Sequence, residues 1–265
     1  MKFIKDVLRN YGLDISRFQP SPYEDLREFE RFKEITVKLL GDDFKIADAQ
    51  SFYWSFREIF LDQIYKFESS NDQPVIIDCG SNYGTSIVFF KDLYPMSRIL
   101  GVEADPITYR LLEWNLNRRG YKNLKLYNRA ISVNQDPVIF HHEGADGGRI
   151  VPLPPSSTQD VFVVEPVMLD ELIQGHVDFL KMDIEGVEVD VICSSIKLVD
   201  VDQLFLEYHS FKDSKQELGR LLEKLSSLDF RYYLHTKFCS PLPLTEETLQ
   251  LGMDLQVNIF AKKQV

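Results

Sequence analysis

A glycine-containing turn is the first group of residues with the spacing that ligand binding needs. The letters DCGSNYG at residues 78–84 follow a short apolar run at residues 75–77. At the end of a parallel strand, such a turn brings backbone N–H groups against a nucleotide or a similar ligand. Gly80 and Gly84 have no Cβ, so we expect the backbone to approach that ligand closely here.

Glu103 is a second candidate for ligand binding. It lies 25 positions after Asp78, where an apolar run ends. A carboxylate there can accept hydrogen bonds from both hydroxyls of a ribose. A nicotinamide-binding fingerprint needs a glycine where Asn82 stands, and this mismatch counts against a dehydrogenase. The alternative is structural, with Asp78 and Glu103 only ending strands or capping helices.

Acidic residues and a histidine follow two later apolar runs. Asp183 and Glu185 lie in the segment KMDIEG, and Glu207 and His209 alternate along a later strand. We expect them at the sheet edge that carries the glycine turn, with Glu207 and His209 on one face of their strand. A buried Glu207 needs a partner, either a hydrogen bond from His209 or Lys181 or a divalent cation shared with Asp183.

The same four side chains can take a proton from an acceptor. An alcohol is weakly acidic, so a carboxylate, a histidine or a metal ion beside it favours its reaction. The predicted catalytic residues are His209, Asp183, Glu207 and Glu185. His209 is the predicted base because its ordinary pKa lies near neutral pH. A structural ion pair at a strand end is the alternative. The segment matches no recognisable metal motif, so no metal ligands are predicted.

The hydrophobic pattern predicts the elements that position these residues. From residue 75 onward, short β-branched runs alternate with longer helical segments, which predicts a mainly parallel sheet with helices on both faces. Residues 136–167 break the rhythm, and we expect an inserted hairpin or lid there, with a mobile loop at residues 144–149. We expect strands at residues 75–79, 99–103, 124–131, 179–183, 203–207, 231–236 and 257–261, the last of them antiparallel.

The segment before residue 74 is predicted to be a helical extension. The letters SPYE at residues 21–24 have the form of a capping box with proline at the first helical position, and Gly41 is the expected stop. A second helix is expected at residues 51–67, with its aromatic side chains packed on the main domain; the alternative is that they line a substrate cleft. A polar segment ending in Pro74 divides this extension, residues 1–73, from a catalytic domain at residues 74–265.

Composition limits the partners. The formal net charge of −11 argues against broad attraction to nucleic acid or to anionic membranes. Cys79, Cys193 and Cys239 are odd in number and widely spaced, which suggests neither a disulfide framework nor a zinc site and fits the cytoplasm. The sequence has no apolar stretch long enough for a membrane span, and it does not predict an oligomeric state.

The sequence also resembles a known family. The runs VIIDCGSNYGTS, ILGVEADPITYRLLEWNL, VDFLKMDIEGVEVDVI and LFLEYH are similar in order and spacing to the FkbM family of S-adenosylmethionine-dependent methyltransferases. The resemblance covers residues 48–230. It implies a Rossmann-like class I methyltransferase domain with a mainly parallel seven-stranded α/β sheet, and S-adenosylmethionine as the cofactor.

The resemblance also implies roles for individual residues. The residues of the glycine turn surround the methionine end of the cofactor, and Glu103 holds its ribose. Cys79 departs from the small or apolar residues, such as valine, that are frequent in the family. We expect it to pack behind the turn and not to act as a nucleophile. The cofactor-binding set is Asp78, Cys79, Gly80, Ser81, Asn82, Gly84, Glu103, Ala104 and Asp183.

The predicted reaction is transfer of a methyl group to a hydroxyl of a saccharide or a related small metabolite. Methylation of nitrogen or of a protein by the same fold is one alternative. A module that binds the cofactor without catalysis is another, and a nicotinamide-dependent oxidoreductase is a third. A divalent cation is compatible with the acidic residues but is not predicted.

Overall fold

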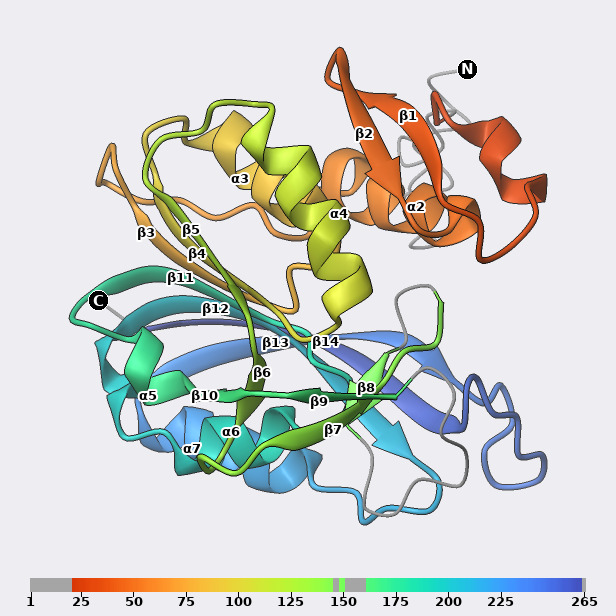
Figure 1. The fold of residues 1–265 in the computed structure, drawn as a ribbon. Coiled ribbons are helices and arrows are strands. Elements are labelled where there is room, and N and C mark those ends of the chain that lie inside the picture. Colours follow the sequence, from red (N-terminus) through yellow and green to blue (C-terminus); the bar gives the residue numbers. More distant parts are fainter. Residues whose placement is uncertain (1–20, 145–147, 151–160, 264–265) are drawn as a thin grey trace, which may run out of the picture.

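A seven-stranded sheet lies at the centre of the computed structural model, which describes residues 21–144, 148–150 and 161–263 (Figure 1). The strand order is β13-β14-β12-β11-β3-β4-β5. Neighbours from β5 to β12 are parallel, whereas β14 runs antiparallel to β12 and β13. The strands are β3 (Val75–Cys79), β4 (Arg98–Glu103), β5 (Leu124–Asn128), β11 (Val177–Met182), β12 (Val201–Phe211), β13 (Phe230–Cys239) and β14 (Met253–Lys263).

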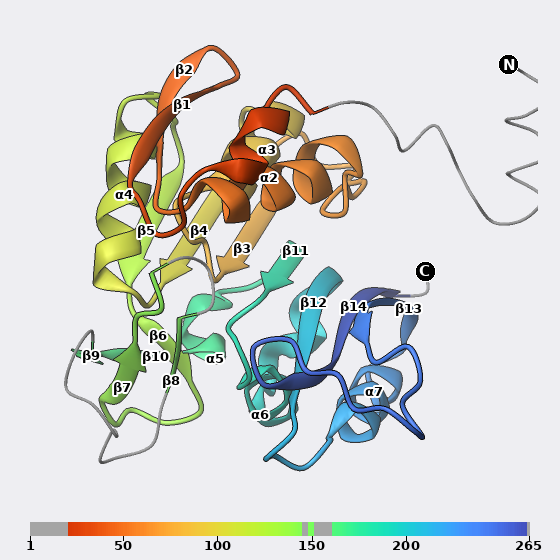
Figure 2. The same ribbon diagram turned by 90° about the vertical axis from the view of Figure 1, so that its right-hand side faces the viewer.

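Helices cover both faces of this sheet (Figure 2). Consecutive strand residues therefore enter different cores: Ile76 packs with α2 (Ala49–Phe56), α3 and α4, and Ile77 packs with α5 to α7. Both are fully buried, as expected for a parallel sheet covered twice. No helix in the described parts of the chain is long and apolar enough to cross a bilayer. The helices are α3 (Thr85–Leu93), α4 (Pro106–Asn117), α5 (Leu169–Leu172), α6 (Glu188–Ser194), the 3-10 helix η4 (Lys197–Asp200) and α7 (Leu218–Ser227).

The strand order creates a crevice at the carboxyl ends of β3 and β11. After β3, the chain adds β4 and β5 on one side, and it later returns to place β11 on the other side. Ligands of open α/β sheets bind at such a switch point. The predicted Rossmann-like α/β class and the antiparallel last strand are confirmed.

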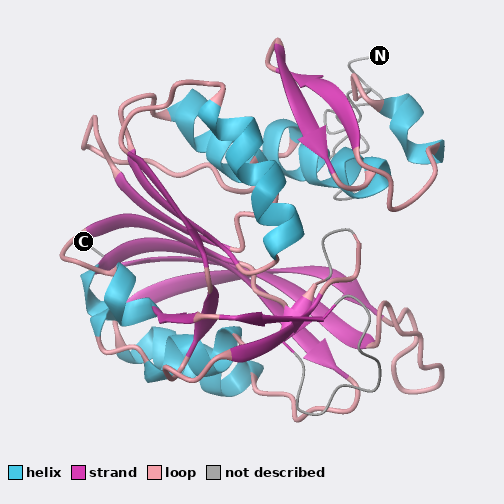
Figure 3. Ribbon diagram, viewed as in Figure 1, coloured by secondary structure: helices cyan, strands magenta, loops and turns pink. Residues whose placement is uncertain are grey.

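The N-terminal segment is only partly helical (Figure 3). The 3-10 helix η2 (Glu24–Glu28) is short, and no side chain caps it at Tyr23. The prediction of a helix reaching Gly41 is wrong, because β1 (Ile35–Leu39) and β2 (Asp42–Ile46) form an antiparallel hairpin. Leu40 and Gly41, with φ of 50° and 91°, make the left-handed turn that two-residue hairpins favour.

The predicted second helix is shorter than expected. It comprises α2 (Ala49–Phe56) and a π-helical turn, η3 (Arg57–Leu61). The Asp48 side chain caps α2 by accepting the N–H of Ser51 at 2.8 Å. Phe52 and Phe56 are buried in the core shared with α3 and α4, so most of this aromatic face packs on the main domain.

The insertion between β5 and β11 contains two small sheets. The predicted strand at residues 124–131 divides into β5 and β6 (Ala130–Ser132), and β6 pairs with β10 (Pro166–Met168). Within the insertion, β7 (Val138–His141) pairs antiparallel with β8 (Arg149–Ile150) and β9 (Val161–Val164). Much of the predicted loop, residues 145–147, lies outside the described residues.

Candidate functional site

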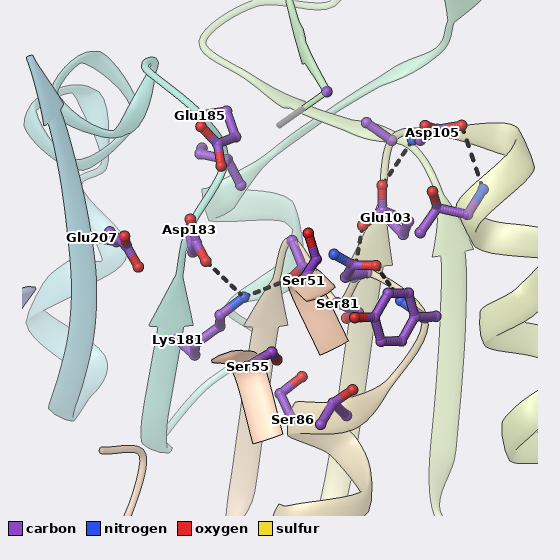
Figure 4. Close-up of a pocket in the computed structure, with 18 of the residues that line it drawn as sticks. Ser51, Ser55, Ser81, Ser86, Glu103, Asp105, Lys181, Asp183, Glu185 and Glu207 are labelled. Atoms are coloured by element: carbon purple, nitrogen blue, oxygen red, sulfur yellow. Dashed lines mark hydrogen bonds and ion pairs between the residues drawn. The ribbon is translucent and has the colours of Figure 1, made fainter. Parts of the chain in front are cut away.

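A cavity of about 710 Å³ opens at the switch point of the sheet. Its walls come from α2 and η3, the turn after β3, the carboxyl ends of β4 and β11 with the residues that follow them, and residues of β6, β7 and β12 to β14. Figure 4 shows Glu103 on one side of this space and Asp183, Glu185 and Glu207 on the other. The predicted site residues that line it are Gly80, Ser81, Asn82, Glu103, Ala104, Asp183, Glu185 and Glu207.

The glycine turn, residues 80–84, is shaped by contacts within the protein. Gly80 has a φ of 80°, and a Cβ added there would lie 1.8 Å from the carbonyl oxygen of Asp183. Gly84 has a φ of 99°, and its Cβ would lie 2.9 Å from Leu112 Cδ1. Both glycines are therefore required by packing against β11 and α4, whereas the sequence had suggested close approach of a ligand.

Glu103 joins the end of β4 to the glycine turn. Its Oε2 accepts the N–H of Asn82 at 2.7 Å, and its Oε1 accepts the N–H of Asp105 at 2.9 Å. Burial raises the pKa of Glu103 to about 7, although these two hydrogen bonds oppose the shift. Each carboxylate oxygen keeps a second acceptor position, so a ribose diol in the cavity fits this group.

Asp78 and Cys79 lie behind the cavity, where they support its wall. Asp78 is fully buried, and its Oδ2 accepts a 2.5 Å hydrogen bond from Ser86 Oγ. Its Oδ1 has no hydrogen bond among the described residues, but Lys181 Nζ lies 3.5 Å away. Cys79 is buried in the core that the sheet forms with α5 to α7, and burial raises the pKa of its thiol far above the ordinary value.

Lys181, which the sequence suggested only as a possible partner of Glu207, lies at the centre of the site. It is buried, it lines the cavity, and it donates a hydrogen bond to the carbonyl of Gly80. Its Nζ also lies 3.8 Å from Asp183 Oδ2. Burial opposes its charge, but the carboxylates of Asp78 and Asp183 outweigh burial and raise the pKa of Lys181. The lysine thus links the glycine turn to the end of β11.

The predicted catalytic residues come together in one acidic cluster, which consists of Asp183, Glu185, Glu207 and His209. His209 Nε2 lies 3.5 Å from Glu185 Oε2 and 3.8 Å from both Asp183 Oδ1 and Glu207 Oε1. The three carboxylates line the cavity. The His209 side chain has no exposed surface and lies behind them.

Glu188 orients the histidine of the acidic cluster. Its Oε1 lies 3.0 Å from His209 Nδ1 and also accepts the N–H groups of Ile184 and Gly186. Burial disfavours the imidazolium, yet Glu188 and Glu185 outweigh it and raise the pKa of His209 well above its ordinary value. Sequence reasoning missed Glu188, although it lies five positions after Asp183 at the start of α6.

Lys237 of β13 connects the acidic cluster to the N-terminal segment. Its Nζ lies 2.9 Å from Glu58 Oε2 and 3.3 Å from Glu207 Oε1. Glu58 belongs to η3, so this chain of ion pairs closes one wall of the cavity. The lysine stands in a strand of mostly exposed residues, and no sequence pattern marks it.

Comparison with known proteins identifies the family. The model of the methyltransferase FkbM domain matches residues 78–232, which include the glycine turn, Glu103 and the whole acidic cluster. The chain belongs to the FkbM methyltransferase family. The resemblance noted in the sequence is thereby confirmed.

The individual relatives found are distant in sequence. The chain is 33% identical over 78 residues to "Methyltransferase sdnD" of Sordaria araneosa, a match that spans 26% of this chain and 30% of that protein. It is 23% identical over 180 residues to "Methyltransferase 1" of Beauveria bassiana strain ARSEF 2860, across 58% of this chain and 72% of the relative. Among solved structures, the methyltransferase FkbM from Methylobacillus flagellatus KT is 15% identical with a TM-score of 0.50, over 97% of this chain and 70% of that one. This likeness supports the fold.

Proposed function

We propose that this FkbM protein uses S-adenosylmethionine to methylate a hydroxyl of a saccharide or a related small metabolite. The position of Glu103 carries the proposal. Its carboxylate is fixed to the glycine turn by the N–H of Asn82 and lines the same cavity as the acidic cluster. S-adenosylmethionine with its ribose bound to Glu103 would therefore lie in the same cavity as the carboxylates of the acidic cluster.

The charge of the cavity suits this cofactor. S-adenosylmethionine supplies a methyl group on a cationic sulfonium, and Asp183 presents a carboxylate in the same cavity. Glu185 and Glu207 also line the cavity, where burial raises their pKa values to about 8 and about 7. Opposite charges attract more strongly in a partly buried site than in water. The turn residues Gly80, Ser81 and Asn82 are proposed to hold the methionine end, with Asp78 and Cys79 supporting them from behind.

The acidic cluster is proposed to manage the acceptor proton. The acceptor oxygen attacks the methyl carbon, the carbon–sulfur bond breaks, and its electron pair stays on sulfur as S-adenosylhomocysteine forms. The hydroxyl proton passes to a cavity carboxylate, for which Asp183 is the best placed because its side chain is 26% exposed. His209 is buried behind the carboxylates, so we propose that it holds them in place and accepts no proton directly from the acceptor.

The N-terminal segment is proposed to form the acceptor side of the cavity. Gln50 and Trp54 on α2 and Glu58 on η3 lie about one helical turn apart, and all line the cavity. Trp54 is 54% exposed, and an exposed indole beside polar groups suits the apolar face and the hydroxyls of a sugar.

The free cysteines, including buried Cys79, fit the proposed cytoplasmic location.

Transfer of a labelled methyl group tests this proposal. The protein is incubated with S-adenosylmethionine labelled in its methyl group and with a panel of saccharides, polyols, amines and peptides. We expect label on a hydroxyl, with turnover lowered about 100-fold or more in Asp183→Asn and unchanged in Glu223→Gln, an exposed residue of α7. Label on an amine or a peptide would instead support methylation of nitrogen or of a protein. Binding of S-adenosylhomocysteine with no transfer to any acceptor would support a non-catalytic module.

A further inference from the structure

Three side chains of the acidic cluster have the spacing of metal ligands. Atoms of Asp183, Glu185 and His209 lie within 4.8 Å of one another. The distances from His209 Nε2, 3.5 Å to Glu185 Oε2 and 3.8 Å to Asp183 Oδ1, exceed the roughly 2.7–3.2 Å of an N–H···O hydrogen bond. Ligand atoms that are each about 2.1 Å from one ion lie roughly 3–4 Å apart, and these distances fall in that range.

Glu188 places His209 as a metal-binding histidine is usually placed. The two side chains are fully buried, and Glu188 Oε1 lies 3.0 Å from His209 Nδ1. Because Glu188 also accepts two backbone N–H groups, it is suited to accept the Nδ1–H of the imidazole. With its Nδ1–H donated to Glu188, the imidazole would present the lone pair of Nε2 to an ion between Asp183 and Glu185. A carboxylate on the far ring nitrogen is the common means of orienting a histidine ligand.

Gln256 provides an independent indication from the neighbouring strand β14. Its Oε1 is buried and has no hydrogen-bond partner among the described residues. Its Nε2 donates to Glu207 Oε1 and lies 3.3 Å from His209 Nε2. The amide nitrogen faces the cluster, and turning the amide by 180° would direct the unsatisfied oxygen toward a cation between Asp183, Glu185 and His209 in place of the hydrogen bond to Glu207. A buried polar atom without a partner requires such an explanation.

The balance of charge points the same way. Four carboxylates, those of Asp183, Glu185, Glu188 and Glu207, gather around one imidazole in a largely buried region. Among the described residues, the cationic side chains that contact them are Lys181, Lys237 and, when it is protonated, His209 itself. Removing charges from water is costly unless they are compensated, and a divalent ion would supply the missing positive charge.

We propose that Asp183, Glu185 and His209 hold a divalent first-row transition-metal ion at the wall of the cavity. A set of two carboxylates and one imidazole suits an ion of the Mn²⁺ to Zn²⁺ series. The ion deepens the proposed function, on which this part rests, because an ion held there would bind the acceptor hydroxyl and ease loss of its proton to a cavity carboxylate. The binding site itself is defined by the three ligands and does not depend on the identity of the acceptor.

Metal binding to the full-length protein tests the proposal directly. Chelator-treated protein is titrated calorimetrically with MnCl₂ and with ZnCl₂, and bound metal is counted by elemental analysis after dialysis. We expect roughly one equivalent of ion, with affinity reduced about 100-fold or more in the Asp183→Asn/Glu185→Gln double variant and in His209→Gln. Glu223→Gln, which removes an exposed carboxylate of α7 that does not line the cavity, should bind the ion like the unaltered protein.

Binding of S-adenosylhomocysteine to each protein, measured in parallel, shows that the cavity is folded. Failure of either ion to bind at about 1 mM, while S-adenosylhomocysteine binds normally, would overturn the metal site and leave the proposed function standing. The acidic cluster would then consist of a protonated His209 that forms ion pairs with the surrounding carboxylates. Equal binding of the ion by the unaltered protein and the double variant would also overturn it. Loss of S-adenosylhomocysteine binding with metal binding intact would count against the proposed function alone.

Discussion

The carboxylate of Glu103 accepts the backbone N–H of Asn82 at 2.7 Å, so the end of β4 is tied to the glycine turn that follows β3. The same carboxylate accepts the N–H of Asp105 ahead of α4. One side chain thus fixes the geometry of two loops at the switch point of the sheet. It also lines the cavity, which makes it the residue on which cofactor binding most directly depends.

Replacement of Glu103 should weaken cofactor binding strongly. In Glu103→Gln, the charged acceptor is lost while the shape of the side chain is kept. Hydrogen bonds to a charged group contribute about 1.5–3 kcal/mol each, so we expect S-adenosylhomocysteine to bind about 100-fold more weakly by calorimetry. Glu113→Gln, an exposed residue on α4, is the matched control. Unchanged affinity in Glu103→Gln would remove the ribose assignment.

Cofactor binding should strengthen as the pH rises through about 7. Burial raises the pKa of Glu103 to about 7, so the carboxylate is largely protonated at pH 6 and largely ionised at pH 8. The ionised form is the better acceptor for ribose hydroxyls. Titrations with S-adenosylhomocysteine across this range should show tighter binding at the higher pH, and Glu103→Gln should flatten the profile. A profile that is equally steep in the variant would point to another group.

The same residue makes stability depend on pH with the opposite sign. The folded protein holds the Glu103 proton more tightly than the unfolded chain, whose pKa is near the ordinary 4.5. Its contribution to stability is therefore full below about pH 4.5 and is lost as the pH rises to about 7, on the order of 3 kcal/mol. Urea unfolding at pH 5 and pH 8 should show a smaller decrease for Glu103→Gln than for the unaltered protein. Equal decreases would show that Glu103 ionises normally.

Alanine at Gly80 should destabilise the fold far more than alanine at another glycine of positive φ. The new Cβ at Gly80 would lie 1.8 Å from the carbonyl oxygen of Asp183, whereas Gly175, with a φ of 105°, has open space around it. We expect Gly175→Ala to cost about 1–2 kcal/mol from backbone strain alone, and Gly80→Ala to exceed about 4 kcal/mol. Thermal or urea unfolding measures both. Similar losses in the two variants would mean that the turn shifts freely away from β11.

Removal of the Lys181 charge should lower the free energy of unfolding, because buried Asp78 then has no cation beside it. In Lys181→Met, Asp78 loses the cation 3.5 Å from its Oδ1, and an unpaired buried charge typically costs about 3–5 kcal/mol. The double variant Lys181→Met/Asp78→Asn should recover much of this loss, since no carboxylate then remains unpaired. Urea unfolding of the four proteins gives the coupling energy. Additive losses in the double variant would show that the two side chains do not depend on each other.

The central sheet was predictable because helices cover both of its faces, so its strands appear in the sequence as short apolar runs. Residues 75–77 and 79 are apolar and lie in a strand packed from both sides, so the sequence pattern and the boundaries of β3 agree. Asp105 and Pro106 likewise begin α4 as expected, with the Asp105 carboxylate accepting the N–H groups of Ile107 and Thr108. Local chemistry fixes both features.

The N-terminal hairpin and the ion pairs were not predictable in the same way. The SPYE letters satisfied a helix-start pattern, but the alternating residues of β1 and the left-handed Leu40 and Gly41 favoured a hairpin that packs on α4. There, Asn115 bonds to the backbone of Lys45 across 70 positions of sequence. The pairing of Lys237 with Glu58 spans 179 positions. Such contacts are set by tertiary structure, and single-sequence patterns carry no record of them.

Calorimetric titration of the purified protein with S-adenosylhomocysteine, with NAD as the control, tests the central claim most directly. Binding of S-adenosylhomocysteine alone, lost or greatly weakened in Glu103→Gln, is the predicted result. Binding of NAD in its place, or of neither compound, would contradict a cofactor site built by Glu103 and the glycine turn.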